Sequence, residues 1–204
     1  MELVGIVFLL VLVGILRYIT RNPKLIGGAA EKRVQRILSG LPQNEYVTIN
    51  DVLIRRPNGN TTQIDHVVVS PYGVFVMETK NYHGYVHGQE NEKYWTQRIG
   101  NQRHRLYNPI WQNRGHIHAL QELLGRSVPM CNIVLFGDRV GLSIQAEQPV
   151  IRIRQLKQFM AQFNMPKLTM LETAEIVERI RRANITDKTE RARHVQQVQG
   201  KKRA

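Results

Sequence analysis

The sequence has a single cysteine, Cys131, and no internal repeat. One cysteine excludes an internal disulfide and any zinc ribbon built from paired cysteines. Because Cys131 directly precedes the apolar stretch 132–136, we expect its side chain to behave as a small buried hydrophobe rather than as a reactive thiol. A reducing compartment fits this cysteine usage best.

Acidic residues are scarce, with 16 Asp and Glu against 29 Lys and Arg, which gives a formal net charge of +13. Such an excess predicts attraction to polyanions, which are either nucleic acid (DNA or RNA) or the anionic face of a membrane. The charge alone does not choose between them. A chain of 204 residues that is 42% hydrophobic is long enough for one compact domain with terminal appendages.

Long apolar runs are almost absent, and the exception extends from Leu3 to Leu16. Continued to Ile19 it reaches the short limit for a membrane-spanning helix, about 17 residues. A cleaved signal peptide is disfavoured because the basic residues follow the run and no small-residue cleavage site does. With Arg17, Arg21 and Lys24 on its C-terminal side, the positive-inside rule predicts a single-pass anchor at residues 1–20 in the bacterial inner membrane, with a cytoplasmic domain. A buried soluble helix is the remaining alternative.

The rest of the chain predicts an α/β or α+β domain at residues 29–183, preceded by a linker at 21–28. Strand-like patterns occupy 46–53, 63–69, 74–80, 132–136 and 150–153, and another short hairpin is expected within 82–97. Helical patterns occupy 29–39, 108–124, 154–163 and 173–183. The polar, basic segment 184–204 is expected to be a disordered tail, which could strengthen non-specific nucleic-acid binding or lie against lipid headgroups.

Two of the predicted strands form a hairpin around the turn 70–73. If Val69 faces Val74, counting along both strands places Asp65 opposite Glu78. Side chains alternate along a strand, so Lys80 projects to the same face as Glu78. Two carboxylates and one ammonium group are therefore predicted to meet.

Opposed carboxylates repel each other unless a cation or a proton lies between them. A divalent metal would remove this penalty, and oxygen ligands suit Mg²⁺ or Mn²⁺. A lysine beside the metal could orient or deprotonate a water molecule, or stabilise charge on a phosphate. The alternative is a salt bridge on a solvated hairpin. Against it, both faces look buried: Val67, Val69, Val74 and Val76 share the face of the charges, and Ile64, Val68, Phe75 and Met77 occupy the other.

The run TQIDHVVVSPYGVFVMETKNYHG at residues 62–84 closely resembles the nuclease-related domain, NERD, a branch of the PD-(D/E)xK nuclease superfamily. The segments GAAE at 28–31, WTQ at 95–97 and NPIWQN at 108–113 resemble further blocks of that family, so the resemblance covers about residues 27–136. It implies a restriction-endonuclease-like mixed sheet flanked by helices. The proline of the superfamily name is absent before Asp65, where Ile64 stands.

The resemblance also implies roles for single residues. Asp65 and Glu78 would be metal ligands, with Thr79 as a third, and Lys80 the catalytic lysine. Glu31 would be the helix carboxylate that supports the metal site, and Gln112 a polar helix residue facing it. Without the resemblance, Glu31 reads as an ordinary acid near a helix N-terminus.

Several other residues carry weaker signals. Gln112 and His116 lie four residues apart on a predicted helix, but neither His116 nor His118 has a metal partner at a persuasive spacing, so no histidine is included in the predicted catalytic set. Aromatic and basic residues also alternate around positions 80–105, as expected for stacking on bases while holding phosphates. The aromatics involved are Tyr82, Tyr85, Tyr94 and Trp95.

The expected function is that of a membrane-anchored, divalent-metal-dependent nuclease acting on DNA or RNA, with Mg²⁺ or Mn²⁺ as cofactor. The alternatives are a non-catalytic, membrane-tethered module that binds nucleic acid or a partner protein, and a chain whose positive charge serves only the membrane surface.

Overall fold

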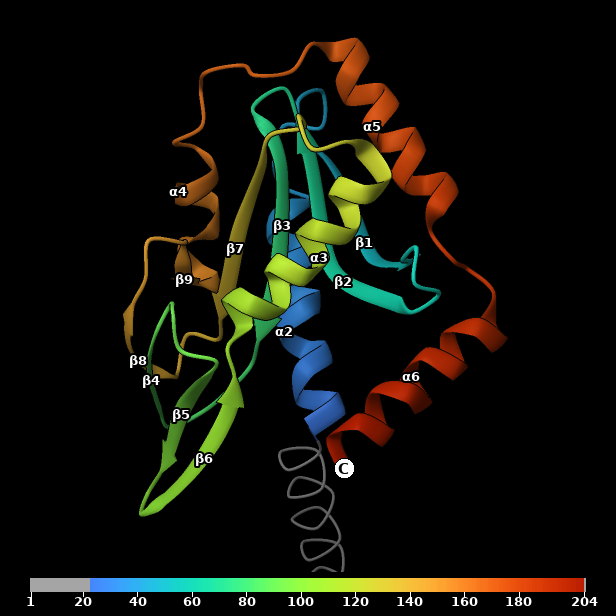
Figure 1. Ribbon diagram of the computed structural model, residues 1–204. Coiled ribbons are helices and arrows are strands. Elements are labelled where there is room, and N and C mark those ends of the chain that lie inside the picture. Colours follow the sequence, from blue (N-terminus) through green and yellow to red (C-terminus); the bar gives the residue numbers. More distant parts are fainter. Residues whose placement is uncertain (1–22, 204) are drawn as a thin grey trace, which may run out of the picture.

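The computed structural model describes residues 23–203 and contains two mixed β-sheets flanked by helices (Figure 1). The larger sheet has the order β1 (Val47–Arg55), β2 (Thr61–Ser70), β3 (Gly73–Lys80), β7 (Met130–Phe136), β9 (Val150–Arg152). The smaller sheet has the order β6 (Gln102–Tyr107), β5 (Tyr94–Ile99), β4 (Tyr85–Gln89), β8 (Gly141–Gln145). The helices are α2 (Pro23–Leu38), α3 (Pro109–Leu124), η1 (Ile153–Gln155), α4 (Leu156–Met160), α5 (Met170–Ala183) and α6 (Lys188–Arg203).

Both faces of the larger sheet are buried, as the sequence predicts. One face, with Val67, Val69, Val74 and Val76, packs against α3 and α5, and the other packs against α2 and α4. In Figure 1 α3 lies in front of this sheet and α2 behind it. The α+β architecture is thus confirmed, with a five-stranded sheet between helices.

One predicted side-chain orientation is wrong. Ile64 lies in the same core cluster as Val67, although residues three apart on a regular strand point to opposite faces. The cause is a local distortion: β1 and β2 pair at Asn50–His66 and at Val52–Ile64, but the residues between, Asp51 and Asp65, are not paired. Asp51 has φ of 55°, a left-handed conformation that Asp tolerates better than most residues.

The smaller sheet is attached through its inner face to the end of β7. Val86 and Trp95 are buried against Val134 and Phe136, and the rings of Trp95 and Phe136 are stacked with centroids 6.4 Å apart. Ile110, in the first turn of α3, belongs to the same cluster. The predicted hairpin within 82–97 is confirmed as β4 and β5.

The ends of the domain differ from the prediction. Helix α2 begins at Pro23, so most of the expected linker 21–28 is helical; proline suits a first helical position, and two glycines weaken a helix without stopping it. The expected disordered tail is wrong for residues 188–203, which form α6. The helix expected at 154–163 is reduced to η1 and the short α4.

The membrane anchor expected at residues 1–20 lies outside the described residues. Within residues 23–203, no helix is both long enough and apolar enough to cross a membrane.

Candidate active site

The site is built on β2 and β3, in the register that the sequence predicts. Val69 pairs with Val74, and the ladder continues to His66 opposite Met77. Asp65 and Glu78 are the next residues along these two strands. The backbone N–H of Thr79 donates to Asp65 Oδ2 at 2.7 Å, so the Asp65 side chain reaches across to β3.

Three of the predicted residues form a closed hydrogen-bonded group. Lys80 Nζ lies 2.6 Å from Glu78 Oε1 and donates to Gln112 Oε1 at 3.0 Å. The Gln112 amide donates in turn to the same Glu78 oxygen at 2.8 Å. Helix α3 positions Gln112, and it starts at a fixed place because Asn108 caps it and Pro109 occupies its first turn.

His116 belongs to this group, although no histidine is part of the catalytic set predicted from the sequence. Its Nε2 lies 3.2 Å from Glu78 Oε2, and its Nδ1 lies 2.8 Å from Thr62 Oγ1. An ionised carboxylate only accepts hydrogen bonds, so Nε2 must carry a proton. The four-residue spacing from Gln112, which puts both side chains on one face of α3, was the signal that could have included it.

The electrostatics of the group favour a charged pair. Burial alone would raise the pKa of Glu78, but Lys80 and the hydrogen bond from His116 bring this pKa down to about 2. Burial alone would lower the pKa of Lys80, and Glu78 overrides it, so this pKa is raised. Glu78 therefore remains a carboxylate and Lys80 an ammonium group at neutral pH.

Asp65 behaves in the opposite way. Its pKa is raised well above the usual value, first by burial and then by repulsion from Glu78 and Glu31, while the Thr79 N–H opposes the shift. The pKa of Glu31 on α2 is also raised, first by burial and then by Asp51 and Glu78. The structure therefore brings the predicted Glu31 into electrostatic range of the other carboxylates.

The donor set fits a hard divalent cation in its chemistry. Asp65 and Glu78 provide carboxylate oxygens, and the buried hydroxyl oxygen of Thr79 has no hydrogen-bond partner within the described structure. Among residues 23–203, however, no three His, Cys, Asp or Glu side chains are grouped closely enough to hold a metal ion by themselves. Mg²⁺ commonly takes only one or two carboxylates and completes its shell with water and phosphate, so two carboxylates are a sufficient protein contribution.

A cleft of about 640 Å³ is lined by residues that neighbour the site residues in the sequence. It lies at the carboxyl ends of the parallel strands β3 and β7, where ligands commonly bind in sheets of this kind. Its lining includes Arg33, two residues after Glu31, and Asn81, which follows Lys80. Arg139, His83 and Asp138 line it as well, and Asp138 forms an ion pair with Arg33, so the cleft wall carries charges of both signs.

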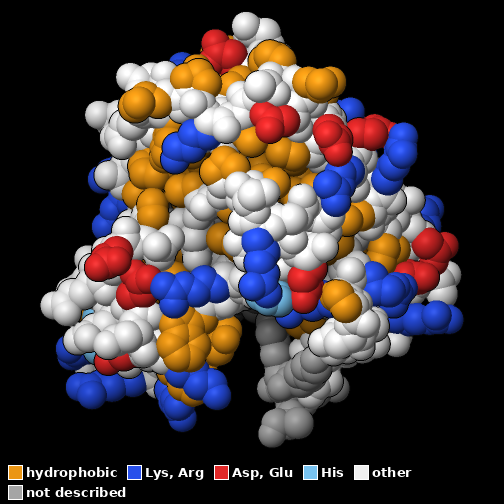
Figure 2. Space-filling view, turned by 45° about the horizontal axis from the view of Figure 1, so that its top comes forward, with side chains coloured by type: hydrophobic (Ala, Val, Ile, Leu, Met, Phe, Trp, Pro, Cys, Tyr) orange, Lys and Arg blue, Asp and Glu red, His pale blue; other side chains and the backbone are white. Residues whose placement is uncertain are grey.

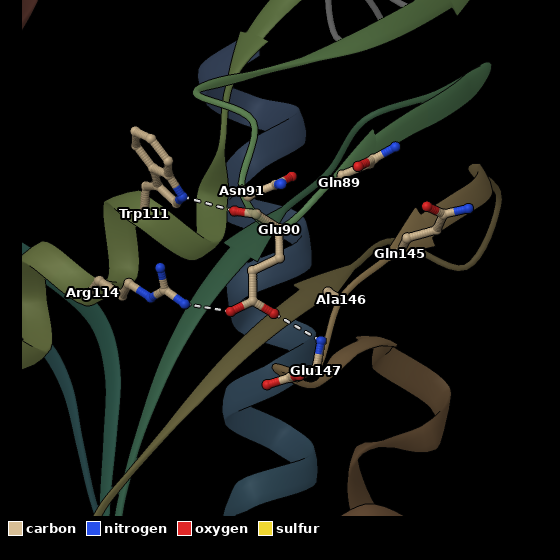
Figure 3. Close-up of a pocket in the computed structure, with 8 residues that line it drawn as sticks. All are labelled: Gln89, Glu90, Asn91, Trp111, Arg114, Gln145, Ala146 and Glu147. Atoms are coloured by element: carbon tan, nitrogen blue, oxygen red, sulfur yellow. Dashed lines mark hydrogen bonds and ion pairs between the residues drawn. The ribbon is translucent and has the colours of Figure 1, made fainter.

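A second pocket, of about 540 Å³, lies between α3 and the loops that follow β4 and β8 (Figure 3). Glu90 joins its walls: it forms an ion pair with Arg114, and its Oε2 accepts from the backbone N–H of Glu147 at 2.8 Å. Its backbone carbonyl accepts from Trp111 Nε1 at 2.8 Å. These bonds hold the loops that follow β4 and β8 against α3, and we assign the pocket no catalytic role.

Two carboxylates and a lysine on paired strands of a mixed sheet, joined to a glutamine on the covering helix, define a nuclease-like domain. The family model of the nuclease-related domain matches residues 26–137, and the chain belongs to this family, a member of the PD-(D/E)xK-like nuclease superfamily. The chain is also 36% identical over 183 residues, 88% of its length, to an uncharacterized protein of Bacillus anthracis, of which the match covers 86%. No solved structure gives a significant match.

Proposed function

We propose that this protein is a divalent-metal-dependent nuclease that hydrolyses phosphodiester bonds of DNA or RNA, held at the bacterial inner membrane by residues 1–20. The observation that carries the proposal is the ion pair of the buried Glu78 with the partly buried Lys80, beside Asp65, a second, partly buried carboxylate whose pKa is raised. A buried ion pair is weak evidence for stability, because apolar residues of similar size often serve as well. A catalytic role explains better than a stabilising one why this ion pair lies next to a further carboxylate.

In this proposal Asp65, Glu78 and Thr79 would hold Mg²⁺ or Mn²⁺. The bound cation would supply an activated water molecule and neutralise charge on the phosphate. Lys80, whose raised pKa keeps it protonated, acts as a positively charged donor toward the phosphate rather than as a base. Gln112 and His116 orient the Glu78 carboxylate through their hydrogen bonds.

One observation favours a second candidate, a non-catalytic module that binds nucleic acid or a partner protein. Both oxygens of Glu78 already have partners, Oε1 with Lys80 and Gln112 and Oε2 with His116. A cation at Glu78 would have to share or displace these partners. If the group is too stable to open, the nuclease-like fold serves binding alone.

Cleavage of labelled single-stranded DNA, duplex DNA and RNA by the purified full-length chain, with Mg²⁺, Mn²⁺ or a chelator, separates the two candidates. We expect metal-dependent cleavage that falls by about 100-fold or more in Asp65→Asn and in Lys80→Met. Glu122→Gln, which changes an exposed carboxylate elsewhere on α3, is the matched control and should retain activity. Undiminished cleavage by both site variants, with circular dichroism showing that they are folded, contradicts the proposal.

The membrane part has its own test. The apolar run from Leu3 to Leu16, with basic residues after it, supports a single-pass anchor with the domain in the cytoplasm. The full-length protein should therefore stay in the membrane fraction after washing at high salt and alkaline pH. Recovery in the soluble fraction would contradict the anchor while leaving the nuclease proposal intact.

A further inference from the structure

The outer face of the smaller sheet has an unusual composition. Tyr94 pairs with Tyr107, Arg98 pairs with both Arg103 and Tyr85, and cross-strand partners share a face. The pairings between the four strands identify the remaining residues of this face. It consists of tyrosines, arginines and small or uncharged polar residues, with neither a carboxylate nor an aliphatic side chain. Its members are Tyr85, His87, Gln89, Tyr94, Thr96, Arg98, Arg103, Arg105, Tyr107, Gly141, Ser143 and Gln145. We call this surface the tyrosine–arginine face.

The three tyrosines remain accessible. Tyr85 is 45% exposed, Tyr94 is 40% exposed and Tyr107 is 46% exposed, whereas Trp95, which points to the inner face, is only 1% exposed. Figure 2 shows Lys and Arg side chains beside hydrophobic ones, with a few Asp or Glu side chains, at the lower left, where the smaller sheet lies. Large aromatic side chains that stay in water on a sheet face are candidates for binding a ligand.

The rings are also held in place. A Cβ atom at Gly141 would lie 2.6 Å from Cδ2 of Tyr85, so the absence of a side chain there lets the Tyr85 ring lie against the backbone of β8. The rings of Tyr94 and Tyr107 meet edge to face with centroids 6.1 Å apart. The guanidinium carbon of Arg105 lies 4.1 Å from the Tyr94 ring centroid. Planar groups fixed on a sheet lose little conformational entropy when a flat ligand stacks on them.

The positive charge of this face is not neutralised. Arg98, Arg103 and Arg105 take part in none of the salt bridges found among the described residues, whereas Arg33, Arg55, Arg114, Arg182 and Arg191 all do. Arginine binds phosphate with several hydrogen bonds and also stacks on planar rings. Exposed rings alternating with unpaired arginines fit a chain of bases and phosphates.

We propose that the tyrosine–arginine face binds single-stranded nucleic acid. Bases can stack on tyrosine rings only when they are unpaired, so this face selects single strands over duplex. A membrane surface fits less well, because the face offers no aliphatic side chains to insert among lipid chains. The inference rests on the proposed function in taking nucleic acid as the substrate, and it adds the strand type.

The face is connected to the candidate active site through the backbone. Strand β3, which carries Glu78 and Lys80, leads into β4 within five residues. The Gly137 N–H donates to the Lys80 carbonyl at 3.0 Å, and the Gly141 N–H donates to the Gly84 carbonyl at 2.8 Å. The first bond joins the end of β3 to the residue that follows β7, and the second joins the starts of β4 and β8, so short segments connect the smaller sheet to the carboxyl ends of β3 and β7.

Fluorescence anisotropy tests the proposal, with the full-length chain in detergent, a chelator to prevent cleavage, and a labelled 20-nucleotide DNA or RNA either alone or as duplex. We expect single strands to bind at least about tenfold tighter than duplex. Tyr85→Ser/Tyr107→Ser should weaken binding about tenfold or more, and Tyr85→Phe/Tyr107→Phe, which keeps both rings, should restore it. Equal binding by the serine and phenylalanine pairs overturns the proposal.

The arginines are tested by charge-matched pairs. Arg98→Gln/Arg103→Gln should weaken binding and reduce the salt dependence of log K by about 1.4, because each phosphate contact on a single strand contributes roughly 0.7. Arg126→Gln/Arg181→Gln removes the same charge from exposed positions outside the smaller sheet and should change affinity less than about twofold. Equal loss in both pairs would mean that only net charge matters, which overturns the proposal. Loss of binding to phosphatidylglycerol vesicles, with oligonucleotide binding intact, would assign the face to lipid and overturn it as well.

The binding test of the tyrosine–arginine face can succeed or fail independently of the nuclease proposal. Binding is measured without metal, and Glu122→Gln, which lies outside both the candidate active site and the tyrosine–arginine face, should bind single strands as the unsubstituted protein does. Ring-dependent binding by a protein that never cleaves would support the face and reject the nuclease. Cleavage by a protein whose binding ignores the rings would support the nuclease and reject the face.

Discussion

Glu78 receives hydrogen bonds on both of its oxygens while only 3% of its surface is exposed. Buried charge is tolerated only when it is paired and hydrogen-bonded, and here Lys80 supplies the charge while Gln112 and His116 supply further donors. Asp65, by contrast, receives one backbone N–H. Of the two carboxylates, Asp65 is therefore the one whose ionised form would gain most from a nearby cation.

The Glu78–Lys80 pair gives the first prediction. Glu78→Gln leaves the buried ammonium group of Lys80 without a counter-ion and should lower the free energy of unfolding by about 3 kcal/mol or more at pH 7. Glu78→Gln/Lys80→Met removes both charges and should recover most of that loss. Urea denaturation in the presence of a chelator measures both. A single variant as stable as the unsubstituted protein would show that the pair is open to water.

Cys131 gives a prediction of pH dependence. Its side chain is partly buried, and this burial raises the pKa of the thiol to about 11, while Lys167 opposes the shift. Only the thiolate reacts with iodoacetamide, so at pH 8 the rate should be about a hundredfold below that of a thiol with a pKa of 9. The rate should increase about tenfold for each pH unit up to about pH 11. A plateau below pH 9 in the folded protein would contradict the burial, and unfolding in urea provides the reference rate.

For the single elements, two runs rich in β-branched residues predicted β2 and β3, because strands buried on both faces are continuously apolar, and the turn between them fixes the register. It could not predict the reversal of side-chain direction between Ile64 and Val67. That reversal depends on β1, where Asp51 takes a left-handed conformation opposite Asp65. A distortion shared by two strands leaves no periodic signal in either one.

Polar, exposed strands were missed for a related reason. Strand β6 has no buried residue, and the sequence of β8 is too short and mixed to show a period. The tail was misjudged because α6 has almost no apolar residues. It is held instead by polar contacts, among them the ion pair of Arg55 with Glu190 and the hydrogen bond between His194 and Thr61.

One contact of α6 can be tested directly. Arg191 donates to the carbonyl of Asp51 at 3.1 Å and to that of Ile185 at 2.7 Å, and pairs with the Asp51 carboxylate. Arg191→Ala should lower the free energy of unfolding by about 1 kcal/mol, a modest amount because the Asp51 side chain is exposed. Arg193→Ala, at an exposed position on the same helix, should change it by less than about 0.5 kcal/mol. Equal effects in urea denaturation would mean that α6 is not docked.

Asn108 is the cap of α3 and also a joint between elements. Its Oδ1 accepts from the Ile110 N–H, while its Nδ2 donates to the carbonyls of Gln89, Glu90 and Glu92. Asp is normally as good a helix cap as Asn, but Asn108→Asp would place a carboxylate against three carbonyl oxygens. We expect it to cost about 2 kcal/mol or more in thermal or urea unfolding, at least as much as Asn108→Ala. A neutral effect would show that the Nδ2 contacts do not form.

At the scale of the whole molecule, the sequence predicted one domain and its candidate site because the residues that carry them are close together in the chain. Asp65, Glu78 and Lys80 lie on a single hairpin, so register alone brings them together. The contribution of His116 depends on how α3 lies across the sheet, and the tyrosine–arginine face depends on β6 and β8, neither of which the sequence predicted. Both features depend on contacts between residues that are distant in the sequence, and local sequence patterns do not predict such contacts.

The fold also shows where some of the excess arginines lie. Arg33 and Arg139 line the cleft beside β3 and β7, where Asp138 pairs with Arg33. The arginines of the tyrosine–arginine face take part in none of the salt bridges among the described residues. A basic surface of this kind raises the local concentration of nucleic acid and makes binding dependent on salt. Membrane attachment would add to this effect by confining the domain to a surface.

We propose that the carboxylates on β2 and β3 hold a divalent cation. The decisive measurement is titration calorimetry with Mn²⁺ on the full-length chain in detergent, with a nuclease-resistant phosphorothioate oligonucleotide present, because calorimetry does not require turnover. We expect the unsubstituted protein and Glu122→Gln to bind Mn²⁺ equally well and Glu78→Gln to bind it at least about tenfold more weakly. Equal binding by Glu78→Gln, or no binding by the unsubstituted protein, would show that these carboxylates do not hold the cation.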